Sequence, residues 1–343
     1  MDNEESVPPA EPPKIGIICN LRHPGKTDVQ TLREEAEFDT PETVEAIGRA
    51  LRRMGAETVV LEADKNLAAA VTASGITMAF NIAEGRAGRA REAQVPALLD
   101  LLGVPYTGSD AVALGVALDK VLCKRLVAAC GVRTADYALV TRPSQLPAHL
   151  HYPVIVKPNA EGSGKGISEH CIAVDETELA QLLARDLPAN PAGLLVEEYL
   201  PGREFTVGIL GNGATRQVLS PMEILYNQNT QRDFKVYSYA VKCNYKEHVR
   251  YECPARLSEA QNRALTEAAG AAFDALGCQD VARADFRMDA AGQPCFLEIN
   301  PLPGLAPGYS DLPMIAQADG IAYDELVCDI YKAARQRMEA AAQ

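Results

Sequence analysis

Two segments near the C-terminal end decide the fold of this chain: Arg283-Ala-Asp285-Phe-Arg287 and Phe296-Leu-Glu298-Ile-Asn300-Pro301. Both alternate polar and apolar residues, which predicts β-strands, because every second side chain of a strand lies on the same face. The charged and amide side chains of each segment should therefore share one face. The turn-like Ala290-Ala-Gly-Gln293 between the segments predicts that they pair as a hairpin.

Folded in this way, the hairpin brings oxygen ligands together beside an arginine. Asp285 and Glu298 supply carboxylates, Asn300 supplies an amide oxygen, and Arg283 lies next to them. Hard oxygen ligands on adjacent rigid strands suit Mg²⁺, which proteins usually hold with few side chains plus substrate phosphates. The hairpin therefore indicates a magnesium site. The alternative is a hairpin whose polar face meets solvent.

The composition is that of an acidic globular protein. The chain has 343 residues, 47% of them hydrophobic, which is enough for two or three domains. Its net charge of −13 argues against nucleic acid and anionic membranes as general partners. No apolar run approaches the ~18 residues of a membrane span. The nine cysteines are scattered without a Cys-x-x-Cys pair, which indicates a reducing cytoplasm and no zinc site.

The order of predicted elements divides the chain into three parts. Strands at 14–19, 58–61, 78–81 and 104–108 alternate with helices, which predicts a three-layer parallel α/β domain. A small α+β unit follows, and antiparallel strands such as 204–210 and 216–224 dominate after it. The predicted divisions are a disordered tail 1–13, an N-terminal α/β domain 14–110, a central subdomain 111–200 and a C-terminal, mainly antiparallel subdomain 201–343.

A long segment inside the last part has no clear periodicity. Residues 225–248 are polar and rich in tyrosine. A long irregular segment inside a compact domain is usually functional. We therefore predict that 225–248 is a lid over the site.

A glycine-rich segment, Glu161-Gly162-Ser163-Gly164-Lys165-Gly166, follows the predicted strand 154–157. It is not a P-loop, because no glycine stands five residues before Gly164 and Lys165 is followed by glycine rather than Ser or Thr. Its glycines still let the backbone approach a ligand closely, and their N–H groups can form an anion-binding nest. The segment indicates phosphate binding; the alternative is a flexible hairpin tip.

Other residues fit a nucleotide site only in combination. Lys157 ends a strand of valine and isoleucine, where a lysine either extends to the surface or faces a bound anion. Lys120 alone would be a solvated helix residue. The strand 194–198 leaves its unit with an N–H and a C=O that match the adenine edge, and Glu204 beyond it could accept from ribose hydroxyls. The alternative is a charged linker between two domains.

Taken in order, these segments resemble the ATP-grasp superfamily, and most closely its D-alanine–D-alanine ligase family, over nearly all of residues 14–335. The resemblance implies an ATP-grasp fold made of the parallel, central and antiparallel parts described above. Its motifs are Asp119-Lys120 with Lys124; Val154-Ile-Val-Lys157-Pro158 with the glycine-rich segment; Val196-Glu-Glu-Tyr-Leu200 with Gly202-Arg-Glu204-Phe-Thr-Val; and Arg283-Ala-Asp285 with Glu298-Ile-Asn300 and Pro303-Gly304.

The resemblance also implies a role for each matching residue. ATP would be bound by Lys120, Lys157, Gly162, Gly164 and Lys165 at the phosphates, by Glu197, Glu198 and Leu200 at adenine, and by Glu204 at ribose. Two Mg²⁺ ions would be held by Asp285, Glu298 and Asn300. The catalytic residues would be Arg283, which stabilises the tetrahedral intermediate, Lys242, which reaches the γ-phosphate from the lid, and Ser163.

Departures from the family cluster around the amino-acid pocket. Cys243 stands where the family has a tyrosine, and the glycine-rich segment lacks the usual pair of serines. The segment after Gly304 is one residue longer than usual. The candidates for substrate contacts are Glu37 for the amine of the first substrate, Ser310 for the carboxylate of the second, and His23, Cys243, Gly304 and Tyr309, with Arg22 and Asp311 beside them.

The resemblance implies an ATP-dependent carboxylate–amine ligase that joins two amino acids through an acyl phosphate and releases ADP. Because the departures affect the substrate pocket, two alternatives stay open. One is a ligase that makes a different dipeptide or amino-acid amide in secondary metabolism, and the other is a non-catalytic ATP-binding regulator. We expect amino-acid or dipeptide substrates, no nucleic-acid or membrane partner, a homodimer and a cytoplasmic location.

Overall fold

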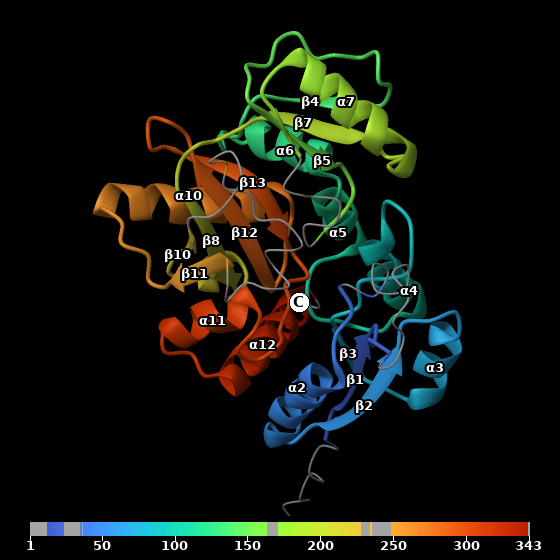
Figure 1. The fold of residues 1–343 in the computed structure, drawn as a ribbon. Helices are drawn as coiled ribbons and strands as arrows, with labels where there is room; N and C mark the ends of the chain where they lie inside the picture. Colours follow the sequence, from blue (N-terminus) through green and yellow to red (C-terminus); the bar gives the residue numbers. More distant parts are fainter. Residues whose placement is uncertain are drawn as a thin grey trace, which may run out of the picture.

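The N-terminal part is a parallel sheet covered by helices, in a computed structural model that describes residues 12–23, 35, 37–162, 171–227, 234 and 248–341. The strand order is β2-β1-β3 (Figure 1). Strands 14–19 and 78–81 have the predicted bounds, but 104–108 forms only an isolated bridge between Ala79 and Tyr106. The elements are β1 (Lys14–Cys19), α2 (Pro41–Arg53), β2 (Glu57–Glu62), α3 (Leu67–Ser74), β3 (Met78–Asn81), the 3-10 helix η1 (Arg91–Ala93) and α4 (Gln94–Leu102).

Local sequence explains where these helices begin and end. Thr40 caps α2 by accepting a hydrogen bond from the backbone N–H of Thr43, and Pro41 occupies the first turn, where its missing N–H has no cost. Gly103 ends α4 in the left-handed region, with φ 67°. Residues 91–102 are thus helical throughout, with a 3-10 first turn at Arg91.

The central part is an antiparallel sheet with strand order β4-β7-β5-β6. Residues 111–129 form two helices rather than one, because Asp119 leaves the helical conformation and caps the second helix by accepting a hydrogen bond from the N–H of Leu122. The elements are α5 (Ala111–Leu118), α6 (Lys120–Ala129), β4 (Tyr137–Val140), β5 (Val154–Pro158), β6 (Ile172–Ala173), α7 (Glu176–Asp186), η2 (Leu187–Ala189) and β7 (Leu194–Glu198).

The C-terminal part is a larger antiparallel sheet with the path β11-β10-β8-β12-β13. The prediction of one strand over 216–224 was wrong: the stretch contains two strands separated at Pro221, which has no N–H to donate to a ladder. The elements are β8 (Glu204–Leu210), η3 (Gly213–Thr215), β9 (Gln217–Val218), β10 (Met222–Tyr226), β11 (Val249–Glu252), α10 (Glu259–Ala275), β12 (Val281–Met288), β13 (Pro294–Asn300), α11 (Asp311–Ala318) and α12 (Tyr323–Ala341).

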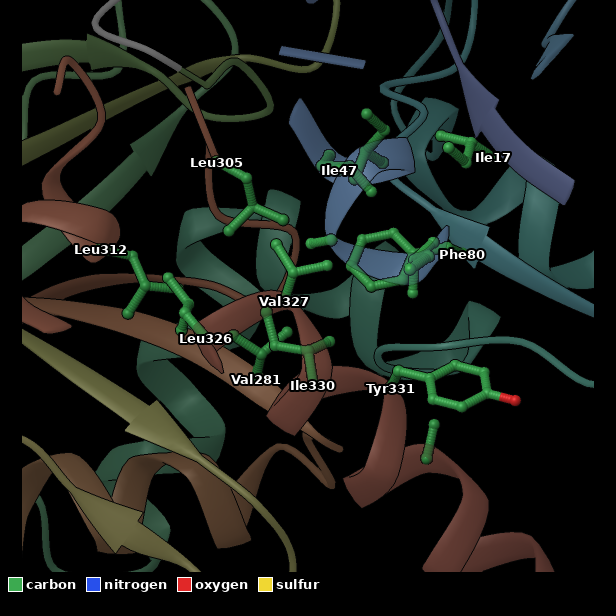
Figure 2. Packing of buried hydrophobic residues seen from close by; sticks show 14 of the residues in the cluster. Ile17, Ile47, Phe80, Val281, Leu305, Leu312, Leu326, Val327, Ile330 and Tyr331 are labelled. Carbon is green, nitrogen blue, oxygen red and sulfur yellow. The ribbon is translucent and has the colours of Figure 1, made fainter. Parts of the chain in front are cut away.

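The two ends of the chain share one hydrophobic core. In Figure 2, Ile47 of α2 and Phe80 of β3 pack with residues of the last helix, including Leu326 and Ile330. Figure 1 shows α12 beside α2 accordingly. We did not predict α11 or α12 from the sequence, so this union of the N-terminal sheet with the C-terminal helices is a finding of the structure.

Two predictions meet the limits of the described residues. The predicted lid 225–248 lies outside them except for 225–227, Phe234 and His248. Within the described part of the chain, no helix combines the length and the apolar character needed to cross a membrane.

Candidate functional site

A cavity lies where the three parts of the chain meet. The N-terminal part contributes the segment around Glu37 and Asp39, the central part contributes β5 and β7, and the C-terminal part contributes β8, β12 and β13. The predicted site residues that line it are Glu37, Lys157, Gly162, Glu197, Glu198, Leu200, Glu204, Arg283, Asp285, Glu298, Asn300, Gly304, Tyr309 and Ser310.

The predicted hairpin of β12 and β13 forms one wall of the cavity. In its register Arg283 lies opposite Asn300, and Asp285 lies opposite Glu298, with a shift in pairing just after Asp285. The alternate residues, such as Ala284, are buried in the core on the other face. The period of two thus predicted correctly that Arg283 and Asp285 share a face, as do Glu298 and Asn300, but Leu297, which we expected on the opposite face, also lines the cavity.

Cations of the protein balance the charges on this wall. Arg283 donates to Asp285 at 3.1 and 2.9 Å and lies 3.2 Å from Asp311. The Nζ of Lys120 lies 2.9 Å from the Oε2 of Glu298. Burial alone would raise the pKa of Glu298, but Lys120, Lys157 and Arg283 together outweigh it and lower the pKa to about 2. For Asp285, burial outweighs Arg283, so its pKa is raised.

The donor set on this wall fits a divalent metal ion. Asp285 and Glu298 are neighbours across a rigid ladder, and the Nδ2 of Asn300 lies 3.5 Å from the Oδ2 of Asp285, so the amide group of Asn300 lies beside the carboxylate of Asp285. Adjacent buried carboxylates repel each other unless a cation lies between or beside them. Oxygen ligands of this kind suit Mg²⁺.

A buried ion triad fixes the lysine of β5. Glu197 lies between Lys124, whose Nζ is 2.9 Å from its Oε2, and Lys157, which contacts its Oε1. Lys124 also donates to Thr134 at 2.7 Å and to the carbonyl of Phe296 at 3.1 Å. Burial raises the pKa of Glu197, but the two lysines outweigh it and lower the pKa to about 2.

This triad changes what Glu197 can contribute to a nucleotide. Its carboxylate faces two lysines rather than a purine, and the carboxylate of Glu198 accepts from the backbone and ring of His151 at 2.8 and 2.7 Å. The main chain of β7 is therefore what these residues offer to an adenine edge. We assigned no role to Lys124 from the sequence, although it belongs to the Asp119-Lys120 motif. The structure shows that it is fully buried and orients Glu197.

Lys120 is held at the start of α6, close to the glycine-rich segment. Its Nζ donates to the carbonyl of Glu161 at 2.7 Å, and its backbone N–H donates to the carbonyl of Asn159 at 2.9 Å. The residue is 6% exposed, so the interpretation of Lys120 as a solvated helix residue was wrong. Lys120 thus contacts both the start of the glycine-rich segment and Glu298.

Glu204 is also held in place by neighbours. It accepts a hydrogen bond from the hydroxyl of Tyr226 at 2.8 Å and lies 3.3 Å from Arg287. Arg287 donates to the hydroxyl of Tyr199 at 2.9 Å and stacks over its ring. Burial outweighs Arg287 and raises the pKa of Glu204.

The part of the cavity lining that comes from the N-terminal residues is rich in acidic side chains. Glu37 accepts a hydrogen bond from Arg91 at 2.9 Å, and a Cβ added at Gly162 would lie 2.5 Å from Glu37, so the glycine permits a close approach. Glu84 and Glu92 belong to the same part of the lining. We predicted Glu37 from the sequence but missed Arg91, Glu84 and Glu92, whose signal was the run of charged residues just before and at the start of the helical stretch 91–102.

The remaining predicted residues are divided between the site and other places. The Oγ of Ser310 accepts from the N–H of Ala306 at 3.1 Å, and a Cβ on Gly304 would lie 2.8 Å from it. His23 does not line the cavity; its ring lies 3.0 Å from Glu35. The other predicted residues, Ser163, Gly164, Lys165, Lys242 and Cys243, lie outside the described residues.

Comparisons with known proteins agree on one family. The family model described as D-ala D-ala ligase C-terminus matches residues 126–332. The chain is 36% identical to the D-alanine–D-alanine ligase of Syntrophotalea carbinolica over 286 residues, which covers 83% of this chain and 88% of the relative. It is 32% identical to an uncharacterized protein, y4sG, of Sinorhizobium fredii over 339 residues, covering 94% and 97%.

Solved structures show the same fold. The crystal structure of the D-alanine–D-alanine ligase from Bacillus anthracis complexed with ATP superposes with a TM-score of 0.73 at 24% identity, covering 95% of this chain and 99% of that chain. The ATP-grasp fold that the resemblance implied is thereby confirmed. The family model and the relatives agree with the fold, and the chain belongs to the D-alanine–D-alanine ligase family.

Proposed function

We propose that this protein is an ATP-dependent, ADP-forming ligase that joins the carboxylate of one amino acid to the amine of a second. Membership of the D-alanine–D-alanine ligase family supports this activity. The observation that carries it at the site is that Arg283, Asp285, Glu298 and Asn300 line the same cavity as Lys157. Phosphoryl transfer needs this combination of oxygen ligands and cations.

Each group then has a place in the reaction. Lys157 and Lys120 bind the phosphates of ATP, while Glu204 binds its ribose. When two Mg²⁺ ions are bound by Asp285, Glu298 and Asn300, they neutralise charge on the transferring phosphoryl group. The first substrate's carboxylate attacks the γ-phosphate, and the second substrate's amine displaces phosphate from the resulting acyl phosphate. Arg283 stabilises the oxyanion that forms in between.

Two alternatives are less well supported. A non-catalytic ATP-binding regulator has no need of both a metal wall and an arginine for an oxyanion. A ligase for a different pair of amino acids has the same machinery, and it differs only in the pocket around Glu37, Tyr309 and Ser310.

We place the protein in the cytoplasm, supported by the free state of all eight cysteines in the described part, and we expect a homodimer as is typical of the family.

The test is ADP release by the purified protein with ATP, Mg²⁺ and a panel of D- and L-amino acids, with products identified by mass spectrometry. We expect release that depends on an amino acid and an amide product. Arg283→Ala should lower kcat by about 10² to 10³-fold, the usual effect of removing one oxyanion donor. The control is Glu259→Gln on exposed α10. ATP binding without turnover for every amino acid would favour the regulator.

A further inference from the structure

Arg283 contacts a second carboxylate, and this one comes from a different element. Its Nε and Nη2 donate to Asp285 on the same strand, β12, at 3.1 and 2.9 Å. Its Nη1 lies 3.2 Å from the Oδ2 of Asp311, the first residue of α11. All three nitrogens of the guanidinium group therefore lie against carboxylates. Because this group is planar and rigid, contacts at all three nitrogens fix its orientation.

The start of α11 is itself held firmly against the sheet. Leu312, the residue after Asp311, is 0% exposed and belongs to the core shared by the two ends of the chain. A Cβ added at Gly208 of β8 would lie 2.7 Å from the side chain of Leu312, so the helix packs closely on this strand. Asp311 lines the cavity beside Arg283. Its carboxylate is thus presented to the arginine by a rigid element rather than by a loop.

An acidic residue at the start of a helix also has a purely structural use, because it interacts favourably with the helix dipole. Glu259 of α10 shows that use: like Asp311, it is the first residue of its helix and follows a serine cap. The side chain of Glu259 is 90% exposed and pairs only with Arg263 of its own helix. The side chain of Asp311 is 15% exposed and faces Arg283. The structural use therefore does not account for where Asp311 lies.

Asp285 alone is a poor support for Arg283 in the proposed reaction. The carboxylate of Asp285 is also a proposed metal ligand, and a bound Mg²⁺ would share it with the arginine. Two cations on one carboxylate repel each other. Asp311 is not among the proposed metal ligands, so its negative charge stays available to Arg283.

We propose that Asp311 is a positioning residue of the ligase reaction, which keeps the guanidinium group of Arg283 directed at the oxyanion of the tetrahedral intermediate. This inference rests on the proposed ligase function and adds a residue to it. Asp311 does not touch the reacting atoms. It acts through Arg283, so its loss should affect the rate of the reaction more than the binding of ATP.

The first test is steady-state kinetics of Asp311→Asn with the amino acid that gives the fastest ADP release. We expect kcat to fall by about 10 to 100-fold, the usual effect of removing an outer-shell partner, with KM for ATP unchanged within about twofold. Asp311→Glu keeps the charge and should retain a higher kcat than Asp311→Asn. Glu259→Gln, the matched change at the start of α10, should alter neither value. An unchanged kcat in Asp311→Asn would overturn the inference.

A double-mutant cycle shows whether Asp311 acts through the arginine. In the background of Arg283→Ala, Asp311→Asn should lower kcat by less than about twofold, because the group that it orients is gone. An equal loss of kcat in both backgrounds would mean that Asp311 acts independently of Arg283, and would overturn the inference. Circular dichroism checks that the variants fold. If Asp311→Asn does not, Asp311→Ser takes its place with the same expected results.

Unfolding measurements separate failure of this inference from failure of the ligase function. If the wild type releases no ADP with any amino acid, the proposed function fails, and the same cycle is then measured by urea denaturation. Asp311→Asn should lower the unfolding midpoint of the wild type, but not that of Arg283→Ala, where Asp311 has lost its cation. Equal lowering in both backgrounds, as expected for Glu259→Gln, would overturn the pairing of Asp311 with Arg283.

Discussion

Buried ion pairs orient the side chains of this site within the protein itself. Glu197 is 1% exposed and lies between Lys124 and Lys157. Removing one member of a buried ion pair is costly, because the remaining charge is left without compensation. The orientation of the Lys157 side chain and part of the stability of the fold therefore depend on the same carboxylate.

Glu197→Gln should lower the free energy of unfolding by about 3 kcal/mol at pH 7 and raise KM for ATP, because Lys124 and Lys157 would face each other. The native pKa of Glu197 is about 2 and its ordinary value is 4.5. The stability that ionised Glu197 contributes to the wild type is therefore fully present above about pH 4.5 and is lost as the pH falls toward 2. Urea titrations of the wild type and Glu197→Gln at several pH values measure this difference in stability. An unchanged unfolding midpoint in Glu197→Gln would contradict the stabilising role of Glu197. Glu259→Gln is the control.

Glu92→Gln should have the opposite effect on stability. Burial raises the native pKa of Glu92 from 4.5 to about 7. A raised pKa means that the folded state binds more protons than the unfolded state between these values, so the wild type loses stability as the pH rises from 4.5 to 7. At pH 8 the variant should be more stable by about 1 to 3 kcal/mol, and at pH 4 the difference should vanish. A variant that is less stable at pH 8 would refute this sign.

At the scale of elements, the connection between β7 and β8 places Glu204 at the site. Gly202 lies in this connection, and its N–H donates to the carbonyl of Met288 at the end of β12 at 3.0 Å. A Cβ at Gly202 would lie 2.4 Å from the same carbonyl oxygen. The strand β8 can therefore approach β12 in this register only with glycine at this position.

Gly202→Ala should lower the free energy of unfolding by about 1 to 3 kcal/mol and raise KM for ATP, because β8 and Glu204 would shift. The matched control is Gly115→Ala in α5, where the nearest atom to the new Cβ is 3.8 Å away. That change should stabilise the helix by about 0.5 to 1 kcal/mol. Chemical denaturation of both variants measures their free energies of unfolding. If Gly202→Ala changes stability no more than Gly115→Ala does, the backbone at Met288 can move to accept the new Cβ without a loss of stability, which would contradict the prediction.

At the scale of the whole molecule, the first and last segments fold together. The core that contains Ile17, Ile47 and Phe80 of the N-terminal part also contains Leu326 and Ile330 of α12 (Figure 2). We infer from this shared core that the N-terminal domain 14–110 and the C-terminal subdomain 201–343 unfold as one unit. The site between them is then positioned by packing rather than by flexible linkers.

Leu326→Ala should lower the free energy of unfolding by about 2 to 5 kcal/mol, as is usual for a large-to-small change in a core, since Leu326 is 0% exposed. The control is Leu101→Ala, at a position 83% exposed, which should change stability by less than about 0.5 kcal/mol. Unfolding followed by circular dichroism and by hydrogen exchange at β1 should give one transition. If the amides of β1 stay protected from hydrogen exchange after α12 has unfolded, the two parts do not unfold as one unit and the inference is wrong.

Sequence by itself determined the local structure and the order of the motifs. The period of two in β12 and β13 predicted that their charged and amide side chains face the cavity, and the predicted bounds of β1, β3, β7 and β8 were confirmed. The break at Pro221 and the two last helices were missed, because packing rather than local preference decides whether such stretches continue.

Only the tertiary structure decided which charges meet. Arg91 and Glu37 are 54 positions apart, and Lys124 meets Glu197 from a different element. No local pattern encodes such pairs, because they form only when strands and helices distant in the chain pack into one core. Local preferences act over a few residues, so the motifs and strand faces can be predicted from them. The cavity itself depends on where the segment around Glu37 meets the central and C-terminal parts of the chain, and packing alone sets that position.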